Sequence, residues 1–185
     1  MKKPEVFLKG NTVSLSILTE EDIQYSNWYR WYNDRETTYY MQQGYFPNTE
    51  EKQLIFFKNE IQHSANKIQL GILPAESEHI IGVVSLSNID YINRKAEFSI
   101  IIGEKEHRGK GYGLEATRLI IDHGFSKLNL NKIYLGVISE HREAIKSYEK
   151  AGFKTDGLLR KDILMHGKYY DTLVMSILAE EFFKF

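Results

Sequence analysis

The sequence predicts one α/β domain of the α+β type, a mixed and mainly antiparallel sheet flanked by helices. Short β-rich runs alternate with segments whose apolar residues recur every three or four positions, the patterns of strands and helices. Two of the β-rich runs form a hairpin pattern, and a later pair encloses a helix, which makes the sheet mixed. A chain of 185 residues fits a single core, so we expect residues 1–185 to form one domain.

The composition limits the classes of function. Apolar residues make up 42% and charged residues 26%, which is enough apolar side chain to fill a core. The 24 Lys and Arg balance 25 Asp and Glu without a long basic run, so no nucleic-acid partner is expected. The absence of cysteine fits a reducing compartment, most simply the cytoplasm. No apolar run suits a signal peptide or a membrane span, so we expect no membrane partner.

The first half of the chain predicts two helices, a hairpin and a central strand. These elements are a strand over 13–17, helices over about 20–32 and from 48–51 to near Ser64, paired strands over 68–73 and 80–86, and a strand over 96–103. The last of these strands is so apolar that both of its faces should be covered, which favours the centre of the sheet.

The second half predicts a strand-helix-strand unit and a final set of strands. These elements are a helix over 113 to about 128, a strand over 132–137, a helix over 142–151 and two or three strands over 153–178. Gly152 should end the second of these helices, and His166-Gly167 should form the turn between the last strands.

The segment Arg108–Gly113 contains three glycines and lies between an apolar strand and a helix. Glycine lets the backbone approach a ligand closely, and successive N–H groups at a helix N-terminus form an anion site suited to a pyrophosphate. Arg108 and Lys110 add positive charge. A purely structural turn is the alternative. A P-loop is disfavoured because the segment does not end in Gly-Lys-Ser/Thr, and a dinucleotide-binding fold is disfavoured because the segment comes too late in the chain.

Two segments in the right order resemble the GCN5-related N-acetyltransferase (GNAT) family. Arg108, Gly111 and Gly113 match its acyl-CoA loop, Gln/Arg-x-x-Gly-x-Gly/Ala, and Ala144–Phe153 resembles its segment ending in Tyr-x-Lys-x-Gly-Phe. Similarity to the RimJ/RimL and spermidine acetyltransferase branch extends the resemblance over about residues 80–178.

The resemblance implies a GNAT fold with splayed central strands and an enzyme that transfers the acetyl group of acetyl-CoA, its co-substrate, to a primary amine. In such enzymes the strand before the loop pairs with the pantetheine arm and polarises the thioester carbonyl. Tyr148 matches the residue that protonates the departing thiolate, and a phenol pKa of about 10 keeps it protonated. The implied cofactor-binding residues are Ile100, Ile101, Ile102, Arg108, Gly109, Lys110, Gly111, Tyr112, Gly113, His141, Ala144 and Lys150.

The two candidate catalytic residues, Tyr148 and Glu97, each have a structural alternative. Tyr148 shares a helix face with Ala144 and Ala151, the position of a core aromatic. A protonated alkyl amine, with a pKa of roughly 10.4, needs a base, and alternation places Glu97 with Ser99 on one face of the central strand. Glu97 either serves as that base, directly or through a water, or pairs with a nearby Arg or Lys.

His141 departs from the family pattern, which commonly has Asn three residues before the position of Ala144. A histidine there can still hydrogen-bond the pantetheine arm. The remaining histidines are scattered along the chain without a second ligand at metal-binding spacing, so we expect no metal.

The acceptor amine is the part that the sequence leaves open. The N-terminal third is dense in aromatic residues, which either stack on a sugar, enclose an ammonium group or simply pack in the core. Asp34 and Glu36 beside them are candidates to attract a cation. Three acceptor classes remain, a polyamine, an amino sugar and a protein N-terminus.

The alternative function is a non-catalytic acyl-CoA-binding module that keeps the fold. The family resemblance also suggests a homodimer.

Overall fold

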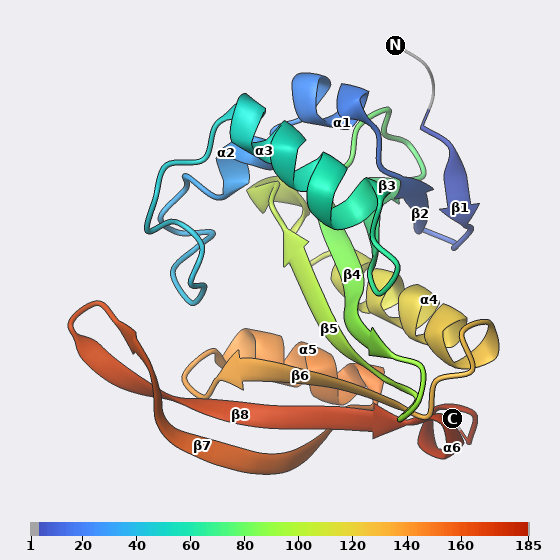
Figure 1. Cartoon of the computed structure of the whole chain (residues 1–185), viewed down its shortest axis with the longest axis vertical. Coiled ribbons are helices and arrows are strands. Elements are labelled where there is room, and N and C mark those ends of the chain that lie inside the picture. Colours follow the sequence, from blue (N-terminus) through green and yellow to red (C-terminus); the bar gives the residue numbers. More distant parts are fainter. Residues whose placement is uncertain (1–3, 185) are drawn as a thin grey trace.

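The computed structural model describes residues 4–184, whose strands form one sheet (Figure 1). The strands are β1 (Val6–Leu8), β2 (Val13–Ile17), β3 (Ile68–Pro74), β4 (Gly82–Asp90), β5 (Lys95–Ile102), β6 (Lys132–Ile138), β7 (Lys154–Met165) and β8 (Lys168–Leu178). They lie in the order β1-β2-β3-β4-β5-β6-β8-β7, and every neighbouring pair is antiparallel except β5 and β6. The predicted mixed, mainly antiparallel sheet is confirmed.

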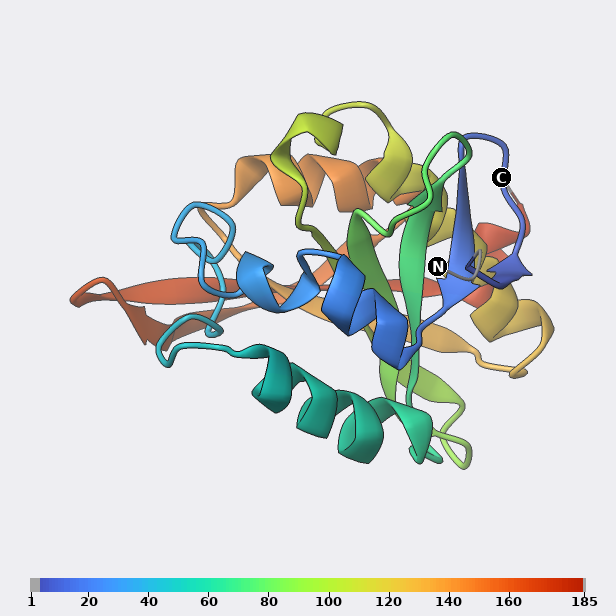
Figure 2. The ribbon, with the colours of Figure 1, turned by 90° about the horizontal axis from the view of Figure 1, so that it is seen from above.

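Helices cover both faces of this sheet. They are α1 (Glu20–Tyr25), α2 (Trp28–Trp31), α3 (Glu50–Phe56), the π-helical η1 (Phe57–Gln62), the 3-10 turn η2 (Lys105–His107), α4 (Tyr112–Ser126), α5 (Arg142–Ala151) and α6 (Ala179–Phe182). Figure 2 shows α4 and α5 on one side of the sheet and α3 on the other. None of the helices described between residues 4 and 184 has the length and apolar character that crossing a membrane requires.

The predicted helix over 20–32 is wrong in one respect, because it is broken into α1 and α2. Ser26 has an extended backbone, its hydroxyl donates to the Asp22 carbonyl, and the same oxygen accepts from Trp28 N–H at 3.1 Å. A serine hydroxyl that replaces backbone hydrogen bonds in this way ends a helix. The second predicted helix is confirmed as α3 and η1, with Thr49 as the N-cap residue.

The prediction that both faces of the central strand are covered is also wrong. β5 does lie in the middle of the sheet, and Ala96 and Phe98 on one face are buried by the main core. On the other face, Ile101 packs with Trp31 of α2, but Ser99 is exposed and Glu97 is only partly buried. The helices on that side reach only one end of the strand, which leaves its polar half open.

β5, α4 and β6 form the predicted strand-helix-strand unit, and its two strands separate along their length. Their parallel pairing is confined to Lys95–Glu97 and Lys132–Tyr134. Beyond these residues β5 stays with β4 while β6 stays with β8, so the two strands form a V whose open end lies at the left of Figure 1. The splayed central strands expected from the family resemblance are therefore present.

The C-terminal elements agree with the prediction in number and position. α5 ends where Gly152 adopts a φ of +104°, a left-handed conformation that glycine tolerates best. β7 and β8 are two long strands joined at His166-Gly167, where both residues have positive φ. The short elements β1 and α6 were not predicted, since three or four residues carry too little periodicity.

Glu115, in the first turn of α4, anchors this helix to the turn between β1 and β2. Its carboxylate accepts hydrogen bonds from the N–H and hydroxyl of Thr12 and from the N–H of Asn11. Partial burial alone would raise the pKa of Glu115, but these hydrogen bonds outweigh it and hold the pKa below its ordinary value. The anchor fixes the position of the helix N-terminus that follows the glycine loop.

Replacing Glu115 with Ala should lower the free energy of unfolding by about 1 kcal/mol at pH 7, since these hydrogen bonds are solvent-exposed. Because the folded-state pKa is depressed, this contribution is present above the unfolded pKa of about 4.3 and is lost as the pH falls through the folded value. Urea unfolding of both proteins checks this, and the difference should shrink at pH 3. A difference independent of pH would contradict the assignment.

Candidate active site

The glycine loop at the start of α4 presents free backbone donors. Gly109 and Gly111 have φ values of +74° and +86°, and the first helical bond runs from Glu115 N–H to Gly111 O. Within the described residues the N–H groups of Gly109, Lys110 and Gly111 make no backbone hydrogen bond, and the first N–H groups of a helix have no partner inside it. This run of donors at the N-terminus of a 15-residue helix can hold a pyrophosphate.

The backbone of β5 divides between its two sides. Gly103 N–H donates to Ile81 O, next to β4, at 2.9 Å. Along a strand, the backbone N–H and C=O groups of successive residues point alternately to one neighbouring strand and to the other. The backbone groups of Ile101 therefore face β4, while those of Ile100 and Ile102 face the gap of the V. The predicted contact of all three with the pantetheine arm needs correction, because the backbone of Ile101 is used inside the sheet.

Tyr148 lies on the α5 side of β5. Its ring packs against Phe98 and Phe153, with centroids 6.0 and 5.9 Å away, so the ring does contribute to the core. Burial raises the pKa of the phenol to about 12. Among the described residues the hydroxyl has no hydrogen-bond partner. A phenol that stays protonated and has an unused hydroxyl is suited to donate a proton.

Glu97 lies on the opposite face of β5, together with Ser99, as the alternation predicts. Its carboxylate accepts a hydrogen bond from Asn88 Nδ2 at 2.8 Å and forms no ion pair with the Arg and Lys residues that the structure describes. Its neighbour across the parallel ladder is Tyr134 of β6, whose pKa is raised by burial and by the charge of Glu97. Sequence reasoning missed Tyr134, because only the strand register brings it to Glu97.

Arg108 does not direct its guanidinium at the glycine loop. Nε donates to Ile102 O at 3.0 Å, one terminal nitrogen donates to Thr37 Oγ1 at 2.8 Å, and the other lies 3.4 Å from Glu36 Oε1. The other predicted cation of the loop, Lys110, is exposed and forms no ion pair within the described residues, so its charge is available to an anion. Tyr112 and Gly113 lie in the first turn of α4, beside Ile100 and Ile102.

The remaining predicted residues lie along α5. His141 is the N-cap residue, stacks on Tyr40 with ring centroids 4.6 Å apart, and has its pKa lowered by burial. Ala144 packs at the edge of the main core. The Lys150 side chain is exposed, and its carbonyl accepts a hydrogen bond from the Arg118 side chain at 3.1 Å.

On the acceptor side, the aromatic residues divide into two groups. Trp28 and Trp31 are buried core residues, which agrees with the interpretation that these aromatic residues simply pack in the core. Tyr39, Tyr45 and Phe46 remain exposed. Buried tryptophans cannot stack on a ligand, so within the N-terminal third the loop after α2 offers aromatic surface to an acceptor.

The two candidate acids are already engaged. Thr37 donates from its N–H and hydroxyl to Asp34, and Lys105 Nζ lies 3.1 Å from Asp34 and 2.9 Å from Glu36. The hydrogen bonds from Thr37 are the main cause that lowers the pKa of Asp34 to about 2. These carboxylates are compensated by cations of the protein itself.

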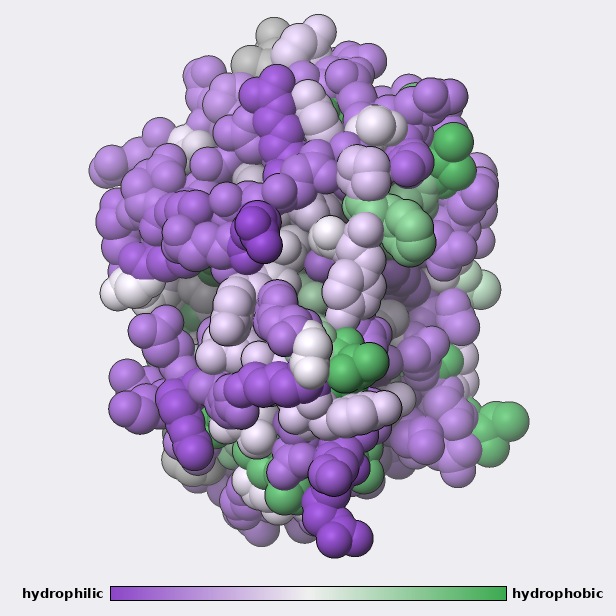
Figure 3. Space-filling model, turned by 90° about the vertical axis from the view of Figure 1, so that its left-hand side faces the viewer, coloured by the Kyte–Doolittle hydropathy of each residue, from purple (hydrophilic) through white to green (hydrophobic). Residues whose placement is uncertain are grey.

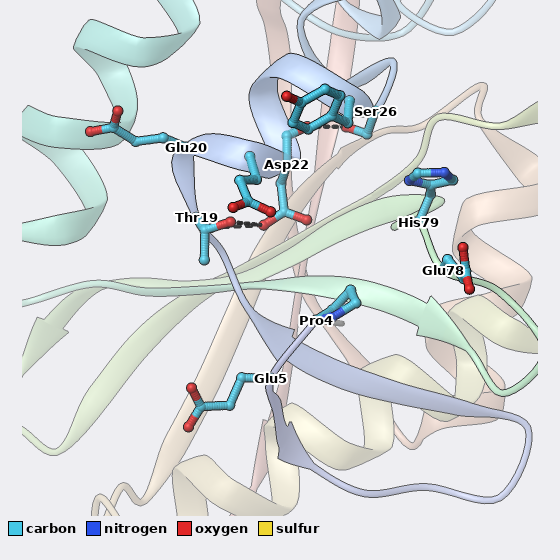
Figure 4. A pocket seen from close by; sticks show the side chains of 10 residues that line it. Pro4, Glu5, Thr19, Glu20, Asp22, Ser26, Glu78 and His79 are labelled. Atoms are coloured by element: carbon cyan, nitrogen blue, oxygen red, sulfur yellow. Dashed lines mark hydrogen bonds between the residues drawn. The ribbon is translucent and has the colours of Figure 1, made fainter. Parts of the chain in front are cut away.

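A cavity of about 280 Å³ lies apart from this site, beside the start of α1 (Figure 4). Its lining includes Glu5, Asp22 and His79, and none of the predicted site residues. In the described part of the chain, no three His, Asp or Glu side chains gather in a cluster able to hold a metal ion.

A mixed sheet whose central strands separate beside a glycine loop with free backbone donors fits the class of acyl-CoA-dependent transferases. The model of the Acetyltransferase (GNAT) domain matches residues 13–154, so the chain belongs to this family.

Spermidine N(1)-acetyltransferases are among the curated relatives. That of Vibrio cholerae is 41% identical over 105 residues, 57% of this chain and 60% of the relative. That of Escherichia coli K12 is 40% identical over 101 residues, 55% of this chain and 54% of the relative. The chain thus matches little more than half the length of these relatives. A putative ribosomal N-acetyltransferase of Bacillus subtilis is 33% identical over 116 residues, 63% of this chain and 62% of the relative.

A solved structure resembles almost the whole chain. The spermidine N-acetyltransferase from Vibrio cholerae in complex with CoA and spermine superposes with a TM-score of 0.84 at 30% identity, covering 94% of this chain and 99% of the other. The likeness includes the N-terminal third, which the sequence motifs alone leave open.

Proposed function

We propose that this protein is an acetyl-CoA-dependent N-acetyltransferase whose acceptor is a polyamine such as spermidine. The observation that carries the proposal is that Glu97 and Tyr148 lie on opposite faces of β5, next to the point where β5 and β6 separate. A base and an acid on either side of a gap suit a reaction in which an amine enters from one side and a thiol leaves on the other.

The chemistry follows from these positions. The amine approaches over the open face, Glu97 takes its proton directly or through a water, and the nitrogen forms a bond to the acetyl carbon. The Ile100 N–H, directed into the gap, stabilises negative charge on the carbonyl oxygen. The carbon–sulfur bond breaks, and Tyr148 gives its proton to the CoA thiolate. The bonded nitrogen loses its second proton to solvent, which returns a proton to Tyr148, so the net reaction releases one proton. The N–H groups of the glycine loop hold the pyrophosphate throughout.

The acceptor class rests on the relatives and on charge. Two curated relatives are spermidine N(1)-acetyltransferases, and a structural relative carries spermine and CoA. The open face offers the Glu97 carboxylate, free of a cationic partner among the described residues, beside the Tyr134 ring. A carboxylate and an aromatic face are both attractive to an ammonium group.

The test is release of CoA thiol from acetyl-CoA with spermidine, spermine, an amino-sugar nucleotide and N-terminal peptides. We expect turnover with the polyamines at the highest kcat/KM. Turnover with peptides alone would favour a protein N-terminus as the acceptor and overturn the polyamine assignment. Tight acetyl-CoA binding without turnover on any amine would favour a non-catalytic module and overturn the proposal.

The proposal also includes a homodimer in the cytoplasm. Leu158, Leu159 and Leu164 on the edge strand β7 are each about half exposed, which is apolar surface that a second copy can cover. Light scattering of the purified protein should give twice the mass of 21.6 kDa.

A further inference from the structure

The loop between α2 and α3 crosses the open end of the V. We call residues 34–46 the crossing loop. Figure 1 shows it at the left, between the tips of β5 and β6, and Figure 3 views the same side, which is covered mainly by hydrophilic residues. The strands of the two arms pair with each other only at Lys95–Glu97 and Lys132–Tyr134, and elsewhere the arms meet through α4, α5 and the core on that face. Whatever holds the crossing loop therefore helps to set the shape of the opening.

The crossing loop is attached to the β6 arm and to the hairpin beyond it. Tyr40 stacks on His141, the residue that begins α5 after β6. Tyr45 Oη donates to Leu164 O at 3.1 Å, and His166 Nε2 lies 2.9 Å from Tyr39 O. These contacts hold the far half of the loop.

On the β5 arm, Met41 packs against the cluster that contains Ile101, and Arg108 supplies the least exposed polar link. Its guanidinium is planar and bridges two groups, the Ile102 carbonyl at the tip of β5 and the Thr37 hydroxyl in the loop, at 3.0 and 2.8 Å. Only 33% of the Arg108 side chain is exposed. Lys105 adds a second, more exposed link through Asp34 and Glu36. A rigid fork that joins two elements is a geometry that lysine cannot reproduce.

Arg108 also lies next to the reacting region through the strand it contacts. The Ile102 carbonyl that it binds belongs to the set of β5 backbone groups directed into the gap, and Gly109 follows Arg108 directly in the glycine loop. Fixing this carbonyl and the crossing loop with one side chain ties the acceptor side to the cofactor side.

We infer that Arg108 is a positioning residue for the acceptor amine: it fastens the crossing loop to the tip of β5, and it does not bind the pyrophosphate through its side chain. This inference rests on the proposed function, since it assigns to the loop the boundary of the amine site. The side-chain charge that serves the pyrophosphate belongs to Lys110.

The first test compares Arg108→Gln with Lys110→Gln, which remove the same charge from the same loop. Arg108→Gln should raise the KM for spermidine about tenfold and change the Kd of acetyl-CoA by less than about twofold. Lys110→Gln should do the reverse, raising the Kd of acetyl-CoA about threefold with the spermidine KM unchanged. Arg108→Lys should resemble Arg108→Gln, because charge without the fork does not bridge. Equal weakening of acetyl-CoA by both Gln variants would overturn the inference.

The partner of Arg108 supplies a matched pair that spares the glycine loop. Thr37→Ser keeps the hydroxyl and should keep the spermidine KM, whereas Thr37→Val should raise it. Thr37→Val also removes the hydrogen bond from the hydroxyl to Asp34. Combined with Arg108→Gln it should therefore still add an effect, but a smaller one than Thr37→Val has in the wild type, because the two changes share the Arg108–Thr37 contact. If the two substitutions multiplied each other's effect on the spermidine KM, the bridge between Arg108 and Thr37 would be contradicted.

A readout without an acceptor separates this inference from the proposed function. Amide hydrogen exchange in residues 34–46 should be faster in Arg108→Gln than in wild type and unchanged in Lys110→Gln. If spermidine proves not to be a substrate, the exchange rates still test whether Arg108 holds the crossing loop, and the acetyl-CoA Kd still tests whether its side chain binds the cofactor. Unchanged exchange in Arg108→Gln would overturn the positioning role whatever the acceptor is.

Discussion

Replacing Tyr148 with Phe is expected to lower kcat for spermidine by about 10²-fold, the usual contribution of a positioned general acid. The substitution removes only a hydroxyl that has no hydrogen-bond partner among the described residues, and the ring keeps its place between Phe98 and Phe153. The acetyl-CoA Kd and the thermal unfolding temperature should therefore hardly change. Steady-state release of CoA thiol, with binding and unfolding measured on the same samples, checks this.

The pH dependence sharpens the prediction for Tyr148. Because burial raises the pKa of its phenol to about 12, the group stays protonated from acid to mildly alkaline pH. The wild-type kcat should thus show no fall from Tyr148 ionisation in that range, and the ratio of wild type to variant should stay constant. Tyr25→Phe, at an exposed position on α1, serves as the control and should keep wild-type kcat. A Tyr148→Phe variant with wild-type kcat would remove Tyr148 from the mechanism.

Replacing Glu97 with Gln is expected to lower kcat/KM for spermidine by about 10²-fold at pH 7, because the protonated amine loses its base. Asn88 can still donate to the amide oxygen of the new side chain, so the local structure should persist. The loss should shrink as the pH approaches the amine pKa of about 10.4, since more of the free amine is then neutral. A pH profile of kcat/KM for both proteins measures this.

The matched control for Glu97 is Glu76→Gln, which removes an equal charge from the exposed turn between β3 and β4. It should leave the whole profile unchanged. If Glu97→Gln raised KM alone, by the same factor at every pH, Glu97 would bind the ammonium group without removing its proton. Wild-type kinetics in Glu97→Gln would leave proton removal to water or another group.

Local patterns in the sequence determined most of the secondary structure and the conformation of the glycine loop. Strand alternation, capping residues and terminal glycines depend on neighbours within a few positions, so β2, β5, α4 and α5 lie where expected. The glycine loop is also local, because backbone φ and a following helix are enough to present its donors. Tyr148 is predicted as the acid from a motif contained within one helix and the turn after it, and this role stays a prediction.

Only the tertiary structure decided how the strands and side chains are used. Alternation placed Glu97 and Ser99 on one face, but strand register was needed to bring Tyr134 beside them and to turn the Ile101 backbone into the sheet. Arg108 belongs to the cofactor motif in sequence, yet its guanidinium binds Thr37, a residue 71 positions away. Long-range partners of this kind follow from the packing of distant segments, which no local periodicity encodes. The sequence by itself therefore determined the family, and the fold decided which side chains and backbone groups are already engaged within the protein.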